Sequence, residues 1–243
     1  MISLVDKRRA IRHLLDGRSP VDGMAVYYAF HHEDDRTSIV IEPDSERPDR
    51  AAGYAAVSRT GIDLFRPLIT TRLPINDLET SANLLKKALP TGAEAFIVAP
   101  QAYGPLIQAV YDVKVEQKLA LYTFPTGMPD PIINIFVTRD DQQGYPRFVI
   151  NREMKGRRVT ASSAGVNWLT PEFGEITVRT RSEFRRRGFG KSVVSTLARH
   201  LIETGRRPIY AVNETNFPSI RLAQQIGFRD SGYRQLMYEV VAK

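Results

Sequence analysis

The chain has 243 residues, a net charge of +7 and no cysteine, which excludes disulfides, thiolate metal sites and a cysteine nucleophile. Its 42% of apolar residues is typical of a soluble globular protein, and the length suffices for one large domain or two small ones. No apolar run reaches the ~18–20 residues that span a bilayer, and the N-terminus has no secretory hydrophobic region, so we expect a cytoplasmic protein without a membrane partner.

The positive charge lies in the second half of the chain. Residues 1–130 carry 15 Lys/Arg and 17 Asp/Glu, whereas residues 131–243 carry 19 and 10. Such a basic half favours an anionic partner or, alternatively, a solvated arginine-rich surface.

In the first half, hydrophobic spacing predicts a helix over 5–16, and Asp77 is placed to cap a second helix over 78–89. A third, shorter helix is predicted over 102–112, and the run 62–73 is extended but interrupted by Pro67. The predicted strands share β-branched or aromatic enrichment and are 24–30, 37–42, 50–58, 94–99 and 115–124. The sequence HHEDD at 31–35 follows the first of these strands. Adjacent histidines on a strand end point to opposite sides, so we expect a charged turn and no metal site.

The segment 125–131 combines three prolines and a glycine, and we place a domain boundary there, with domains 1–128 and 129–243. Beyond it we expect helices over 189–204 and 217–228. The strands expected there are 132–138, 147–152, 157–169, 174–181, 208–213 and 235–241. One order, strand–helix–strand–helix–strand, therefore occurs twice, over about 62–124 and about 174–241.

The stretch RRRGFGKSVV, residues 185–194, lies between a predicted strand and the clearest predicted helix. A Walker phosphate loop needs a glycine five residues before its Gly-Lys pair, and Arg185 at that position argues against a nucleotide triphosphate site. Gly188 and Gly190 still permit an anion to approach the exposed amides of a helix start. The alternative is a tight turn with solvated arginines.

Two segments carry a resemblance to a known family. RSEFRRRGFGKSVV resembles the Arg/Gln-x-x-Gly-x-Gly/Ala signature of the GNAT superfamily of N-acetyltransferases, and NETNFPSIRLAQQIGF resembles that family's second, asparagine-led segment. The positions that match the two patterns are Arg185, Gly188, Gly190, Asn216, Ser219, Leu222, Gly227 and Phe228. The resemblance covers about 65 residues and implies a GNAT fold of mixed α/β (α+β) class, a mostly antiparallel mixed sheet flanked by helices. With the repeated element order, it suggests a tandem of two GNAT-like units.

The resemblance also implies an acetyl-CoA site, with acetyl-CoA as cosubstrate and no metal. Its pyrophosphate would lie on the loop amides, and its pantetheine arm would pair with the strand before the loop. The residues that correspond to these roles, with the asparagine beside the arm, are Val178, Arg179, Thr180, Arg186, Arg187, Gly188, Phe189, Gly190, Lys191 and Asn216. A plain helix-capping role for Asn216 is compatible with this one.

Amide formation from a thioester needs a base for the amine and an acid for the thiolate. The family often places a glutamate on the strand before the loop, and Glu175 is the candidate base here; the alternative is a solvated residue paired with Arg179. Ala223 stands where the family commonly has a tyrosine acid. The general acid is therefore left open, and the possible donors are Tyr210, Ser219, Tyr233 or solvent.

We therefore expect an acetyl-CoA-dependent N-acetyltransferase that acts on an amine of a small molecule or peptide. The alternatives are a non-catalytic acyl-CoA-binding sensor and a nucleic-acid binder, and we expect no nucleic-acid partner because no basic groove interleaved with aromatics is visible. In the first half, PINDLETSANLL offers two acidic residues and no glycine where a phosphate should lie. That half is expected to be a GNAT-like unit without a cofactor loop, or an unrelated α+β domain. The acceptor amine, the acyl chain length and the oligomeric state stay open.

Overall fold

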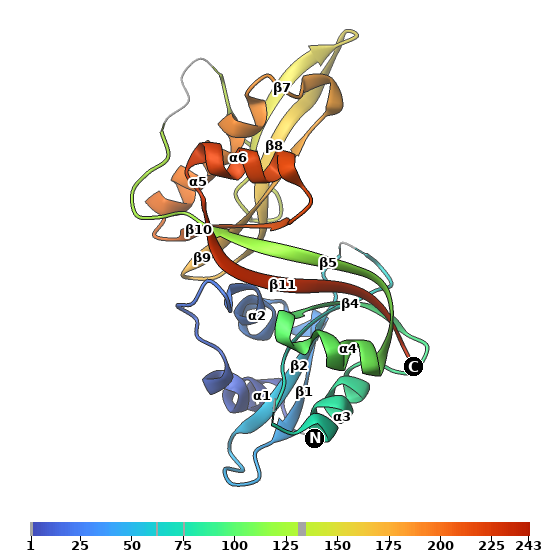
Figure 1. Ribbon diagram of the computed structural model, residues 1–243. Coiled ribbons are helices and arrows are strands. Elements are labelled where there is room, and N and C mark those ends of the chain that lie inside the picture. The colour runs from blue at the N-terminus through green and yellow to red at the C-terminus, as the bar shows by residue number, and fades with distance from the viewer. Residues whose placement is uncertain (1, 62, 75, 131–134) are drawn as a thin grey trace. The chain divides into compact units, whose positions relative to one another are not determined.

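The structure is a computed structural model that describes residues 2–61, 63–74, 76–130 and 135–243 (Figure 1). The chain folds into two compact units, and the first unit takes residues from both ends of the chain. It comprises Met1–Leu119 and Arg234–Lys243, while the second comprises Ala120–Tyr233. The predicted boundary between 128 and 129 differs from this division, because residues 120–128 belong to the second unit and the last strand belongs largely to the first.

The first unit is a sheet of strand order β1-β2-β3-β4-β11-β5 with helices packed on it. Its main helices are α1 (Leu4–Ile11), α2 (Gly23–Val26), α3 (Leu78–Ala88) and α4 (Gly104–Val110). Its strands are β1 (Thr37–Pro43), β2 (Ala51–Ser58), β3 (Leu68–Arg72), β4 (Glu94–Pro100), most of β5 (Tyr111–Thr123) and the second part of β11 (Arg229–Ala242). β3 and β4 run parallel, whereas β1–β2, β2–β3 and β4–β11 are antiparallel. The predicted cap of α3 is confirmed, because the Asp77 side chain accepts a hydrogen bond from the Thr80 amide.

The strand expected over 24–30 is wrong. This segment forms α2 and a π-helical turn over Tyr27–His31, and the following Asp34–Arg36 is a short 3-10 turn. Its aromatic and β-branched residues favour a strand locally, but Val26 and Ala29 are buried in one cluster with Ile39 and Tyr54 from β1 and β2. Packing against the sheet therefore overrides the local preference.

The second unit has the strand order β5-β10-β9-β8-β7-β6, beginning with the last residues of β5. Its strands are β6 (Thr138–Arg139), β7 (Phe148–Met154), β8 (Arg157–Leu169), β9 (Phe173–Thr180) and β10 (Arg207–Asn213). The helices are α5 (Phe189–Glu203) and α6 (Phe217–Ile226). Of the strand expected over 132–138, residues 132–134 lie outside the described residues, 135–137 are not a strand, and only Thr138 is in a strand, β6. The remaining predicted elements of this half form within a few residues of their expected positions.

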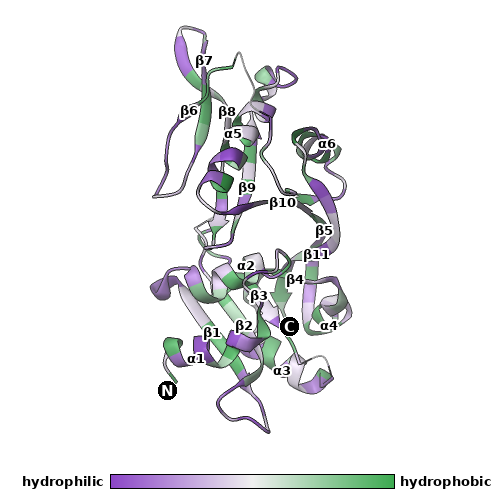
Figure 2. Ribbon diagram, turned by 90° about the vertical axis from the view of Figure 1, so that its left-hand side faces the viewer, coloured by the Kyte–Doolittle hydropathy of each residue, from purple (hydrophilic) through white to green (hydrophobic). Residues whose placement is uncertain are grey.

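The helix α5 places one apolar face on the sheet of the second unit. Val193, Val194, Leu197 and Leu201 are all buried there. Apolar and polar segments alternate along α5 in Figure 2, as expected of a helix with one buried face. The helix ends at Gly205, whose φ of +80° is the left-handed conformation that glycine adopts readily.

The two long strands β5 and β11 each contribute to both units. Ala120 and Tyr122, near the end of β5, are buried in the core of the second unit with α5 and β8. Leu236, Tyr238 and Val240, from β11, are buried in the core of the first unit with α3 and α4. The first unit therefore completes its sheet and its core with the C-terminal part of β11, whereas the second unit is formed by one contiguous segment that includes the end of β5.

The predicted repeat of strand, helix, strand, helix, strand is confirmed. It is formed by β3-α3-β4-α4-β5 and again by β9-α5-β10-α6-β11. Within the described residues no helix is long and apolar enough to cross a membrane.

Candidate active site

The strands β9 and β10 of the second unit are parallel but pair over only three residues. The ladder runs from Phe173, paired with Arg207, to Glu175, paired with Ile209. Beyond it β9 continues to Thr180 and β10 to Asn213 without further pairing to each other. The backbone edge of 176–180 that faces β10 is thus left open to a ligand that pairs like a strand.

The two faces of β9 have different neighbours. A Cβ added at Gly174 would lie 2.9 Å from the Leu201 side chain of α5, so the face that contains Gly174 is the one that packs on α5. Ile176 and Val178 share that face and contribute to the same core. Glu175, Thr177 and Arg179 consequently lie on the face opposite α5.

The loop before α5 is built to present backbone amides. Arg186 and Gly188 both have positive φ, +59° and +77°, and Gly188 immediately precedes the first turn of the helix. Backbone conformations that alternate between right-handed and left-handed turn successive amide N–H groups toward one side, which forms a concave anion site. No side chain among the described residues caps α5, in contrast to α3 and α6, whose N-termini are capped by Asp77 and Asn216. The first-turn amides of α5 are therefore available to an anion.

The side chains of this loop surround its amides with positive charge. Arg186, Arg187 and Lys191 are exposed, and the Arg187 guanidinium lies 5.5 Å from the centre of the Phe184 ring. Phe189 is buried in the core and anchors the helix start. A Cβ at Gly190 would lie 3.3 Å from the Thr180 hydroxyl, so glycine here permits close packing of α5 on the end of β9.

Glu175 is buried and hydrogen-bonded to two donors. Its carboxylate accepts from the Asn167 amide at 2.9 Å and from the Trp168 indole N–H, and the residue is 5% exposed. Burial raises the pKa of Glu175, and the two hydrogen bonds oppose this in part. The alternative of a solvated glutamate paired with Arg179 is wrong. Sequence reasoning missed both donors, because an irregularity in the β8–β9 register sets Trp168 opposite Glu175.

On the opposite face of the sheet, Tyr210 is the first residue of β10 beyond the paired segment. Its ring is buried in the core to which α5 and α6 also contribute. Burial raises the pKa of Tyr210. Ala223 is fully buried in the same core, and Tyr233 is half-buried on β11. The Asn216 side chain accepts from the Ser219 amide at 3.3 Å, so its capping role is confirmed.

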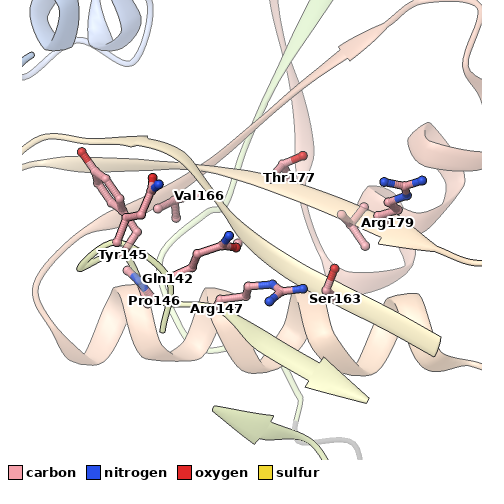
Figure 3. Close-up of a pocket in the computed structure, with 11 residues that line it drawn as sticks. Gln142, Tyr145, Pro146, Arg147, Ser163, Val166, Thr177 and Arg179 are labelled. Atoms are coloured by element: carbon pink, nitrogen blue, oxygen red, sulfur yellow. The ribbon is translucent and has the colours of Figure 1, made fainter. Parts of the chain in front are cut away.

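A pocket of about 220 Å³ lies beside the far half of β9. Arg147, Ser163 and Arg179 follow one another along its wall, at the start of β7, in β8 and in β9 (Figure 3). Val178 and Arg179 therefore border both this pocket and the open edge of β9. Of the pocket residues only Val178 and Arg179 were predicted as site residues, and the sole sequence signal for the rest was the basic character of the second half.

The two histidines of the segment 31–35 differ in their surroundings. His32 is buried and its Nδ1 is 2.8 Å from the Thr37 hydroxyl, while His31 is exposed. No group of three or more potential metal ligands occurs in the described parts of the chain.

Known proteins share a sequence segment and the fold with this chain. Residues 157–236 match the family model described as FR47-like protein. No curated protein matches the sequence.

Solved structures resemble the whole chain. A GCN5-related N-acetyltransferase from Sphaerobacter thermophilus is 13% identical, with a TM-score of 0.62 over 100% of this chain and 95% of that one. A GNAT-family acetyltransferase from Colwellia psychrerythraea is 14% identical, with a TM-score of 0.55 over 99% and 98%.

A tandem GNAT protein from the clavulanic acid biosynthesis pathway is 10% identical, with a TM-score of 0.55 over 98% of this chain and 94% of that one. At such identities the likeness concerns the fold. The predicted resemblance to the GNAT superfamily and the predicted fold, including its tandem character, are confirmed.

Proposed function

We propose that this chain, which has the GNAT fold and carries an FR47-like segment, is an N-acetyltransferase whose second unit transfers the acetyl group of acetyl-CoA to an amine. The single observation that carries the proposal is the uncapped start of α5, with Arg186 and Gly188 in left-handed conformations, next to the open edge of β9. The cytoplasmic location expected from the sequence stays a prediction.

The residues present fit the cosubstrate at two places. The amides of Gly188, Phe189 and Gly190 would hold its pyrophosphate, with Arg186, Arg187 and Lys191 adding positive charge. The edge of Val178–Thr180 would pair with the peptide-like pantetheine arm, since β10 does not pair with that stretch. When bound, acetyl-CoA supplies the acetyl group as an activated thioester.

Glu175 would accept the proton that the acceptor ammonium must lose before it attacks. Its raised pKa makes this carboxylate a stronger base than an ordinary glutamate. Because Asn167 is exposed and bonded to the same carboxylate, the proton route from the surface would pass beside that amide, directly or through one water.

Tyr210 would donate the proton that the departing thiolate takes up. It adjoins the open segment from the α5 side, whereas Glu175 faces the other side, so acid and base flank that segment. Packing of the buried ring in the core of the second unit fixes the position of this donor. Tyr210 would thereby serve as the general acid in place of the tyrosine that the family commonly has at the position of Ala223.

The proposal is tested by calorimetric titration of acetyl-CoA into the parent protein and a Gly188→Glu variant. The new side chain sets a negative charge among the amides, so we expect binding by the parent and its loss in the variant. Gly188 has positive φ, and any side chain strains it.

Two control variants distinguish the effect of a negative charge at Gly188 from the effect of backbone strain and from that of the same side chain elsewhere. Gly188→Ala introduces the strain alone and should bind more weakly than the parent but better than Gly188→Glu. Gly205→Glu adds the same side chain at a similar φ, +80°, at the other end of α5, and should bind normally. A folded parent that fails to bind acetyl-CoA contradicts the proposal. Binding without turnover on any amine would favour the acyl-CoA sensor.

A further inference from the structure

We propose that the pocket at Arg147 and Arg179 receives an anionic group of the acceptor, so that the acceptor is an amine that also carries a carboxylate or a phosphate. This inference rests on the proposed function. It names the substrate class of that site.

The pocket is formed by three adjacent chain segments of the second unit. Ser163 of β8 pairs with Arg179 of β9, and Gly165 pairs with Thr177, so the central wall is a regular antiparallel ladder. Arg147 immediately precedes β7 and closes the pocket from the other side (Figure 3). The turn before β7 adds the side chains of Gln142 and Tyr145. The pocket is thus a feature of regular strands and one hairpin.

The charge of the lining is positive only. Arg147 and Arg179 line the pocket, and none of its lining residues is acidic. A second cavity of about 550 Å³ shares Arg147, Ser163 and Arg179, and adds Arg181 and Arg185 against the lone carboxylate Glu183. Guanidinium groups bind carboxylates and phosphates through paired hydrogen bonds, so a lining that contains two of them suits an anion.

One of the two arginines is held in place by a carboxylate outside the pocket. Arg147 Nη1 lies 2.8 Å from Asp140, with side-chain exposures of 30% and 55%. This pair offsets part of the charge but leaves the remaining donors of the guanidinium for a ligand, since arginine carries five N–H groups. Arg179 is exposed.

Gly165 provides the room between the strands. A Cβ at this position would meet Arg147 Cγ and the Pro146 carbonyl at 3.9 Å, an ordinary contact distance. A larger side chain there would therefore fill the pocket without disturbing the backbone. The hydroxyls of Ser163 and Thr177 add neutral hydrogen-bonding groups beside the arginines.

The pocket is suitably placed with respect to the proposed base. Arg179 and Thr177 lie on the same face of β9 as Glu175, four and two residues further along. Four residues of strand span about 13 Å, much of which the Arg and Glu side chains bridge. An acceptor with its anionic group at Arg179 and its amine toward Glu175 thus needs several bonds between the two, as in the ε-amine of lysine.

The test compares amines in pairs that differ by the anionic group. Lysine is paired with 1,5-diaminopentane, and phosphoethanolamine with ethanolamine, each titrated calorimetrically into the protein saturated with CoA. We expect the anionic member of at least one pair to bind about tenfold more tightly or better in the parent. Arg147→Gln should remove that preference while acetyl-CoA affinity stays at the parent value.

Two further variants serve as controls. Arg157→Gln removes an exposed arginine at the turn between β7 and β8 that lines neither cavity, and should keep the preference. Gly165→Val fills the pocket with no change in charge, and should weaken binding of the anionic members. Its β-branched side chain suits a strand.

The outcomes distinguish this inference from the proposed function. A parent that binds acetyl-CoA but shows no preference for the anionic member of either pair overturns the inference and leaves the function standing. Equal loss of acetyl-CoA affinity in Arg147→Gln also overturns it, because the pocket would then serve the cosubstrate. Absence of acetyl-CoA binding in the folded parent overturns both.

Discussion

At the scale of single residues, the fluorescence of Trp168 should follow the protonation of Glu175. The chain has one tryptophan, and its indole N–H donates to the Glu175 carboxylate. We predict that tryptophan fluorescence changes with pH at a midpoint above the ordinary glutamate pKa of about 4.3, because burial raises the pKa of Glu175. Glu175→Gln should abolish this transition. A transition that persists in the variant contradicts the assignment.

The raised pKa of Glu175 determines the direction in which both the stability of the fold and the acetylation rate change with pH. A carboxyl group whose pKa is higher in the folded state stabilises the fold most at low pH, and its contribution is lost as the pH rises through the folded pKa. The acetylation rate should rise over that same pH range, because the ionised form is the base. Glu175→Gln should lower the rate by about a hundredfold or more and flatten this limb. The amide N–H₂ that this substitution introduces faces one of the two side-chain donors that bonded to the carboxylate, which destabilises the variant. Thermal unfolding of the variant therefore checks that it is folded.

The proposed acid gives a second residue-scale prediction. Tyr210→Phe keeps the buried ring and removes only the hydroxyl. We expect acetyl transfer to fall by about a hundredfold with acetyl-CoA affinity unchanged. Tyr233→Phe, which removes the hydroxyl of the half-buried tyrosine on β11, is the matched control and should retain activity. The reverse pattern would assign the acid to Tyr233.

At the scale of elements, the equivalent helices of the two repeats begin in opposite ways. α3 is capped by the Asp77 carboxylate, which accepts from Thr80 N at 2.9 Å, whereas α5 begins at Gly188 with no side-chain cap. A carboxylate at a helix start fills the place that an anion would take. At the start of α3, the first unit therefore has no anion-binding loop equivalent to the one before α5.

This difference predicts separate effects for the two helix starts. Asp77→Ala should lower the free energy of unfolding by about 1 kcal/mol, measured by denaturant titration, and leave acetyl-CoA affinity unchanged. Asp77→Asn, which retains a capping oxygen, should lose less stability. Weaker acetyl-CoA binding in Asp77→Ala would contradict the separation.

Local sequence patterns predicted most elements where the pattern and the packing agree. The α5 stripe and the Asp77 cap formed as expected, because hydrophobic period and capping are local properties. The segment 24–30 failed because its aromatics pack in a helix on β1 and β2. The loop at 185–190 could be predicted from its glycines. The pocket beside β9 could not, because Arg147 and Arg179 come to line the same pocket only through the pairing of β7, β8 and β9.

At the scale of the whole molecule, the last strand stabilises the first unit. Leu236 is buried in the core with Leu85 of α3 and Ile107 of α4. Leu236→Ala should cost about 2–5 kcal/mol and raise hydrogen exchange in β4 and α4, with α5 unchanged. Met237→Ala, at the neighbouring and less buried position, should cost less. Increased exchange confined to α5 would contradict the assignment of this strand to the first unit.

The pairing of β4 with β11 also bears on how the chain is made. Glu94–Pro100 pairs with Gln235–Val241, which is synthesised only after the whole second unit. During synthesis, residues 1–119 therefore emerge with an edge strand that lacks its partner, a feature that favours pairing with other chains. The first unit begins to be synthesised before the second but is completed after it, and fragments that stop short of residue 235 should aggregate through the exposed edge of β4.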